Sequence, residues 1–123
     1  MTYETFLDYL SKVEILSKAL DKEIATCGPE LRVVILAGIG SCIGRHILDF
    51  SYEERKYILE LIEDGIKSPD ELFRTQITTG LIEAMPNAAE KVGAFSYLMT
   101  AVGAETREYI KAIDQFYGVI AAK

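Results

Sequence analysis

Cys42 and His46 are the side chains of this sequence whose spacing could support nucleophilic catalysis. Four residues apart on one helix, they would share a face, as a thiolate–imidazole pair requires. A structural explanation competes: a small buried thiol beside a histidine in the last turn of a helix, where positive charge is favoured. His46 is the single histidine, and no HExxH or ExxH motif is present. We therefore expect no enzyme, no catalytic residue, and no metal or cofactor site.

The two cysteines, Cys27 and Cys42, lack the CxxC spacing of redox and metal sites. We interpret them as structural thiols in a reducing compartment, with a disulfide as the alternative. The first ten residues, MTYETFLDYL, carry acids where a secretory signal carries lysine or arginine. The longest apolar run, Val33 to Ile39, is too short to span a bilayer. These features predict a cytoplasmic protein.

Glycines follow an apolar run in the segment LRVVILAGIGSCIGRHILDF, from Leu31 to Phe50. The spacing there is G-x-G-x-x-x-G, without the G-x-G-x-x-G spacing or the second strand of a dinucleotide-binding unit. As a helix the segment is apolar nearly all round, so we expect a buried central helix in which Gly40 and Gly44 admit a close neighbour. Each interior glycine costs about 0.8–1 kcal/mol relative to alanine, so a local break or a short strand is the alternative.

Carboxylates are the abundant reactive groups, and they concentrate between residues 51 and 86. That stretch holds 8 acidic and 4 basic residues, whereas residues 87–123 hold 4 of each. The net charge of -6 disfavours binding to nucleic acids or anionic membranes and favours a basic partner. A solvated helical face with supporting pairs such as Glu63–Lys67 is the alternative explanation. The candidate partner-binding residues are Tyr52, Glu53, Tyr57, Glu60, Glu63, Asp64, Asp70, Glu71 and Glu83.

Hydrophobic residues recur every three or four positions along almost the whole chain, which predicts helices. Capping boxes are expected where serine or asparagine precedes glutamate by three residues, and Pro69 fits a first helical position. Gly28-Pro29 and Pro86-Asn87 are expected to interrupt the helical pattern. The expected helices cover residues 3–24, 31–50, 51–67, 69–85 and 87–103, with a last helix that carries Tyr109, Ile110, Ile113, Phe116, Tyr117 and Ile120. The expected capping boxes are Ser51 with Glu54, Ser68 with Glu71, and Asn87 with Glu90.

These elements predict one all-α domain over residues 1–123, a bundle of five to six helices arranged as helical hairpins. Half of the residues are hydrophobic and 26% are charged, as is ordinary for a folded globular chain. At 123 residues the chain buries roughly two thirds of its unfolded surface, which supports a single core.

The run YILELIEDGIKSPDELFRTQITTGLIEAM resembles a segment of small, acidic, helical bacterial proteins. In those proteins a helix ending in an apolar-apolar-Glu pattern precedes an acidic turn and a second helix with a similar ending. They resemble the immunity proteins of polymorphic-toxin and contact-dependent inhibition systems. The resemblance implies a non-enzymatic cytoplasmic protein that binds and neutralises one cognate toxin. The alternative is a homo-oligomeric helical adaptor or small-ligand-binding regulator, with the glycine-containing helix at the subunit contact or lining a pocket.

Overall fold

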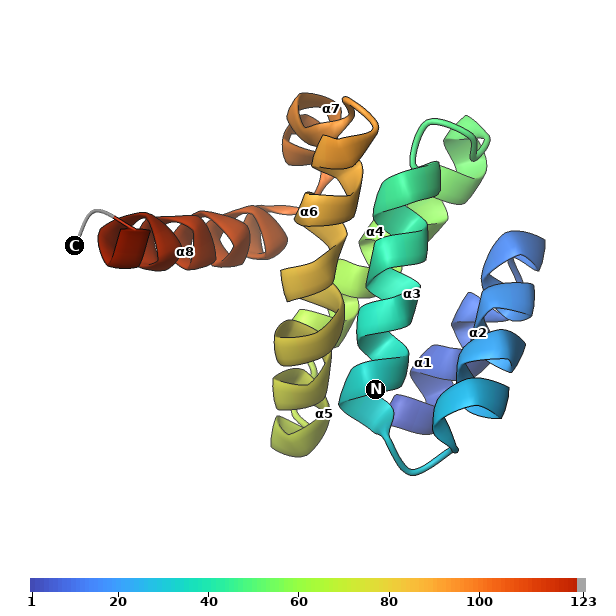
Figure 1. Ribbon diagram of the computed structural model, residues 1–123. Helices are drawn as coiled ribbons and strands as arrows, with labels where there is room; N and C mark the ends of the chain where they lie inside the picture. Colours follow the sequence, from blue (N-terminus) through green and yellow to red (C-terminus); the bar gives the residue numbers. More distant parts are fainter. Residues whose placement is uncertain (122–123) are drawn as a thin grey trace.

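The computed structural model describes the backbone of residues 1–121 and the side chains of residues 1–115 (Figure 1). The described residues contain helices and no strands, which confirms the all-α class. In order, the elements are α1 (Tyr3–Leu10), α2 (Glu14–Cys27), α3 (Arg32–His46), α4 (Tyr52–Ile66), α5 (Glu71–Gln76), the π-helical segment η1 (Ile77–Ile82), α6 (Glu83–Lys91), α7 (Phe95–Ala101) and α8 (Ala104–Ala121).

The number of helices differs from the expected five to six. When α5, η1 and α6 are counted as one continuous helix, the described residues form seven. The expected first helix, residues 3–24, divides where Val13 adopts the extended φ and ψ of −100° and 120°. The Ser11 hydroxyl donates a 2.8 Å hydrogen bond to the Leu7 carbonyl, a local bond that competes with helix continuation. Because the chain turns there, α1 and α2 both direct apolar side chains into the core.

The break expected at Pro86-Asn87 is wrong, because Pro86 lies inside α6. Proline cannot donate to the carbonyl four residues earlier, and its ring crowds that carbonyl. The six residues of η1 directly precede α6, and their wider turns accommodate the irregular hydrogen bonding upstream of the proline. Asn87 is therefore an interior helical residue, and the capping box expected for Asn87 with Glu90 does not form.

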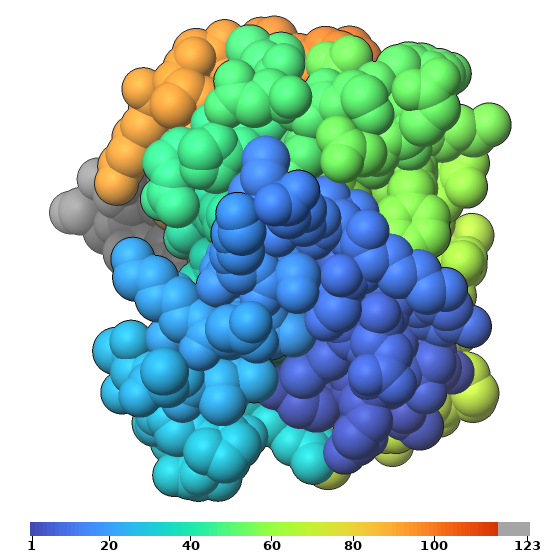
Figure 2. Space-filling view, turned by 90° about the vertical axis from the view of Figure 1, so that its right-hand side faces the viewer, coloured from blue at the N-terminus to red at the C-terminus, as the bar shows by residue number. Residues whose placement is uncertain are grey.

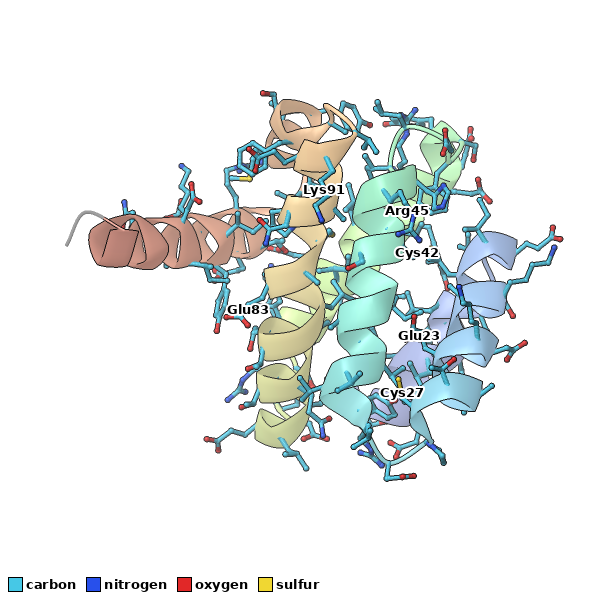
Figure 3. All side chains as sticks on the ribbon, in the orientation of Figure 1. Glu23, Cys27, Cys42, Arg45, Glu83 and Lys91 are labelled. Atoms are coloured by element: carbon cyan, nitrogen blue, oxygen red, sulfur yellow. The ribbon has the colours of Figure 1, made fainter. Side chains whose placement is uncertain are left out.

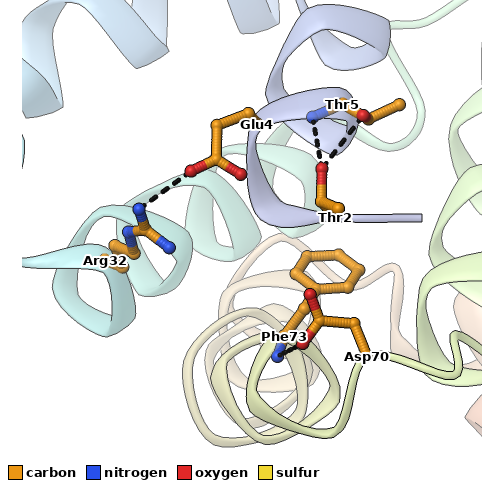
Figure 4. Close-up of polar contacts among 6 residues, drawn as sticks. All are labelled: Thr2, Glu4, Thr5, Arg32, Asp70 and Phe73. Atoms are coloured by element: carbon orange, nitrogen blue, oxygen red, sulfur yellow. Dashed lines mark hydrogen bonds and ion pairs between the residues drawn. The ribbon is translucent and has the colours of Figure 1, made fainter.

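The capping box at Ser51 is confirmed. The Ser51 hydroxyl accepts from the Glu54 N–H at 3.1 Å, and the Glu54 carboxylate accepts from the Ser51 N–H at 2.9 Å. The box expected for Ser68 with Glu71 is wrong, because Asp70 caps α5 by accepting from the Phe73 N–H at 3.1 Å (Figure 4).

Ser68 and Pro69 consequently precede α5, so Pro69 is not its first residue. The buried Ser68 hydroxyl donates instead to the Met1 carbonyl and accepts from the Asp70 N–H. A contact with the start of the chain thus replaces the expected local cap.

α3 packs in parallel against the continuous helix of residues 71–91, and both rise from the bottom of Figure 1. Three glycines allow this approach. A Cβ on Gly80 would lie 2.6 Å from the Val33 carbonyl oxygen, and Cβ atoms on Gly40 and Gly44 would overlap the carbonyls of Leu81 and Met85. Parallel neighbours separated by α4 are not the sequential hairpins expected. α3 is also not buried all round: Leu31, Val33 and Val34 at its start are exposed.

We call the contact between α3 and the helix of residues 71–91 the seam. The remaining helices pack around this seam and complete the core. α1 and α2 lie on one side of α3, where Phe6 packs against Phe73 with ring centroids 5.3 Å apart. An ion pair from Arg32 Nη2 to Glu4 Oε1, 2.9 Å long, links α3 to α1 (Figure 4). α8 projects away from the rest of the bundle (Figure 1). Its expected apolar residues Phe116, Tyr117 and Ile120 have side chains outside the described part.

Within residues 1–121, none of the helices combines the length and the apolar character needed to cross a bilayer.

Candidate protein-binding surface

Four of the candidate residues form one stripe along α4. Glu53, Tyr57, Glu60 and Asp64 follow each other at intervals of four, three and four residues, which places them on one face of an α-helix. The opposite face carries Ile58 and Ile62, both fully buried. Burial of that face therefore directs the stripe outward, and the capping box at Ser51 fixes where the helix begins.

α1 borders this stripe. The Tyr57 hydroxyl donates a 2.8 Å hydrogen bond to the Tyr9 carbonyl, which joins the two helices. Burial, with a smaller contribution from Tyr9, raises the pKa of Tyr57, so its phenol remains a neutral donor at physiological pH. In Figure 2 the dark blue atoms of α1 adjoin the green atoms of α4 on the right of the molecule. We name Tyr9, Glu53, Tyr57, Glu60 and Asp64 the acidic surface.

Two shallow hollows flank the Tyr57 ring. One, of about 300 Å³, is lined by residues that include Tyr9, Glu60 and Asp64. The other, of about 340 Å³, is lined by Lys12, Val13, Glu53, Glu54 and Tyr57. Each hollow thus combines an aromatic ring with two carboxylates, a chemistry that can receive a lysine or arginine side chain, although Lys12 already supplies one cation to the second hollow.

Glu63 does not belong to the acidic surface, because it caps α8. One carboxylate oxygen accepts from the Thr106 N–H and hydroxyl at 2.9 and 2.7 Å, and the other accepts from the Glu105 N–H at 2.9 Å. Lys67 Nζ lies 3.5 Å from the latter oxygen, and the Glu63 side chain is only 12% exposed. Burial acts to raise the pKa of Glu63, but these hydrogen bonds and the Lys67 charge outweigh it and hold the pKa below its ordinary value.

The other four candidates are dispersed. Tyr52 is 66% exposed but lies outside the stripe, and Asp70 is the cap of α5. Glu71 is exposed in the first turn of α5. Glu83 lines a separate cleft of about 630 Å³ between α6 and α8. The structure therefore gathers four of the nine candidate residues into one surface.

Cys42 and His46 do not pair. His46 Nδ1 lies 2.9 Å from Asp49 Oδ2, and Cys42 is buried with a free thiol. Burial raises the pKa of Cys42, which the nearby charge of Arg45 does not offset, so the thiol is held in its protonated form. Figure 3 shows Cys42 on α3 and Cys27 on α2; both cysteines are free.

Among the described residues, no three histidine, cysteine, aspartate or glutamate side chains are placed to share a metal ion.

Sequence reasoning missed the contribution of α1. Tyr9 and Lys12 belong to the apolar-periodic first segment, and Lys12 Nζ lies 4.9 Å from the centroid of the Tyr9 ring. The available signal was that Tyr9 falls outside the apolar stripe of Tyr3, Phe6 and Leu10, and its side chain is 39% exposed. That α4 would be its neighbour is a tertiary contact that local spacing does not encode.

Comparisons of this chain with family models, with curated proteins and with solved structures gave no match.

Proposed function

We propose that this protein is a non-enzymatic binding protein, an immunity protein that neutralises a cognate basic toxin through its acidic surface. The observation that carries the proposal is the α4 stripe, in which three exposed carboxylates surround Tyr57 above two hollows. Tyrosine at the centre of a charged surface is typical of binding hot spots. The imbalance of charge, 8 acidic against 4 basic residues between positions 51 and 86, supports a partner whose contact surface is positively charged.

The mechanism is electrostatic and steric. A nuclease toxin presents lysines and arginines to its anionic substrate, and the carboxylates of the acidic surface attract the same side chains. Such complementarity mainly accelerates association, while the tyrosine and its hollows provide the short-range contact. The bound protein then covers the cleft that the toxin uses for its substrate.

The test is a titration of the protein against the purified toxin domain encoded by the gene immediately upstream. We expect tight binding and an association rate that falls about tenfold or more in the triple variant Glu53→Gln, Glu60→Gln, Asp64→Asn. The charge-matched control is Asp21→Asn, Glu30→Gln, Glu90→Gln, which changes three exposed acids elsewhere. Equal rates for the two triple variants, or the absence of binding, would contradict the proposal.

One observation favours a second function, a homo-oligomeric adaptor. Leu31, Val33 and Val34 expose 46%, 38% and 49% of their surfaces at the start of α3. Gly40 and Gly44 of α3 are already used for packing inside the bundle, which leaves these exposed apolar side chains at the start of the helix for a subunit contact. Analytical ultracentrifugation tests this second function: a stable dimer dissociated by Val34→Asp supports the adaptor, and a monomer argues against it.

A further inference from the structure

A groove of about 360 Å³ runs between α3 and α6, away from the acidic surface. Its apolar lining residues, here called the floor, are Ala84, Ala88 and the exposed Val92, which follow each other at four-residue intervals. The floor is continuous because the helices touch there: a Cβ on Gly44 would lie 3.0 Å from the Ala88 Cβ. The groove is therefore partly apolar and open to solvent.

Both walls of the groove carry hydrogen-bond donors. Ser41 and Arg45, one turn apart on α3, form one wall, and Asn87 and Lys91, one turn apart on α6, form the other. Because the two helices run parallel, Arg45 and Lys91 come to the same end, as Figure 3 shows. None of the described residues that line the groove is acidic.

The charges of Arg45 and Lys91 are not compensated within the described part of the chain. Most described lysines and arginines contact a carboxylate, a carbonyl oxygen or an aromatic ring; the exceptions are Lys22, Arg45, Lys56 and Lys91. Two of these four exceptions share one groove. Both also lie in the last turns of their helices, where a positive charge complements the helix dipole. The dipoles account for each charge separately but not for a groove lined by donors on both sides.

We propose that this groove binds a small organic oxyanion, with the anionic group between Arg45 and Lys91 and an apolar body on the floor. The planar guanidinium of Arg45 matches two oxygens of a phosphate or carboxylate, and Lys91 adds a second positive charge. Ser41 and Asn87 are placed to bond polar atoms further along the ligand. The groove volume lies at the lower end of the range typical of small-molecule sites. This site does not depend on the proposed immunity function.

The test is an NMR titration of the full chain with phenyl phosphate, followed through the backbone amides. We expect saturable shifts confined to residues 41–45 and 84–92. Benzoate and inorganic phosphate are titrated in parallel. Tighter binding of phenyl phosphate than of benzoate identifies a phosphate site, and comparable binding identifies a general oxyanion site. Weaker binding of inorganic phosphate than of phenyl phosphate is expected because it lacks the apolar body.

The double variant Arg45→Gln, Lys91→Gln should bind phenyl phosphate at least about tenfold more weakly, because it loses the charge-assisted hydrogen bonds. The control Lys22→Gln, Lys56→Gln removes the same charge from exposed positions outside the groove and should bind within about twofold of the original chain. Equal weakening in both double variants, shifts spread over the whole surface, or equal binding of uncharged benzyl alcohol would overturn the proposal. Circular dichroism confirms that each variant is folded.

Discussion

Replacement of Gly40 by alanine should destabilise this protein, although alanine is the better helix former. The added Cβ would overlap the Leu81 carbonyl oxygen and lie 2.9 Å from the Leu81 Cα and 3.0 Å from its carbonyl carbon. Carbon atoms pack best at about 3.5–4.0 Å, so the helices must separate by somewhat under 1 Å. The obstructing atoms belong to the backbone, which no side-chain rotation can move away.

The magnitude follows from two opposing contributions. Alanine gains about 0.8–1 kcal/mol of helix propensity over glycine. Overpacking typically costs 1–3 kcal/mol, and a gap of 0.5–1 Å along the seam loses a quarter to a half of each dispersion contact. Because α3 meets η1 and α6 along most of its length, many contacts are weakened together. We expect a net loss of about 1–3 kcal/mol in the free energy of unfolding.

Gly38→Ala is the matched control in the same helix. The three atoms nearest to its Cβ would all belong to the end of the Glu23 side chain, which can rotate aside. We expect this variant to be unchanged or stabilised by up to about 1 kcal/mol. Urea denaturation followed by circular dichroism measures both variants. If Gly40→Ala proves as stable as Gly38→Ala, the close backbone contact at Leu81 is refuted.

Three further predictions concern single groups. Glu63 has a lowered pKa, so its carboxylate stabilises the fold above its ordinary pKa, and this stability is lost as the pH falls through the lowered value. As the pH is lowered, the free energy of unfolding should therefore fall less in Glu63→Gln than in the original chain. In the control Glu60→Gln, which changes an exposed residue, it should fall as much as in the original chain. Alkylation followed by mass spectrometry should modify half-buried Cys27 well before buried Cys42; equal rates would contradict the burial described. Ser51→Ala should cost about 1 kcal/mol in thermal denaturation, through loss of the capping box, and an unchanged Tm would count against it.

The features predicted correctly from the sequence are those set by neighbouring residues. The box of Ser51 with Glu54 depends on atoms three residues apart, so the local pattern is sufficient. At Ser68 the same pattern failed because the hydroxyl bonds to the carbonyl of Met1, a residue far away in the chain. The helix break predicted at Pro86 was wrong for a related reason: the π-helical turns before the proline have no simple signal in the pattern of apolar residues.

The same distinction applies to the candidate surface. The periodicity of α4 indicated which carboxylates point outward, and the structure places Glu53, Glu60 and Asp64 together as that pattern requires. Periodicity could not reveal that the Glu63 carboxylate accepts hydrogen bonds from the first turn of α8, because that contact joins residues more than forty positions apart. Nor could it place Tyr9 beside Tyr57.

The parallel seam between α3 and the helix of residues 71–91 has a kinetic consequence. Gly40 meets Leu81 only after the intervening chain, about 40 residues, has closed into a loop, which costs roughly 3 kcal/mol of chain entropy. Antiparallel hairpins would close loops of only a few residues. Since folding rates fall as contacts become less local, this chain should fold more slowly than an up-and-down bundle of equal length. The glycines that allow the two helices to touch thus also mark the long-range contacts that we expect to form most slowly during folding.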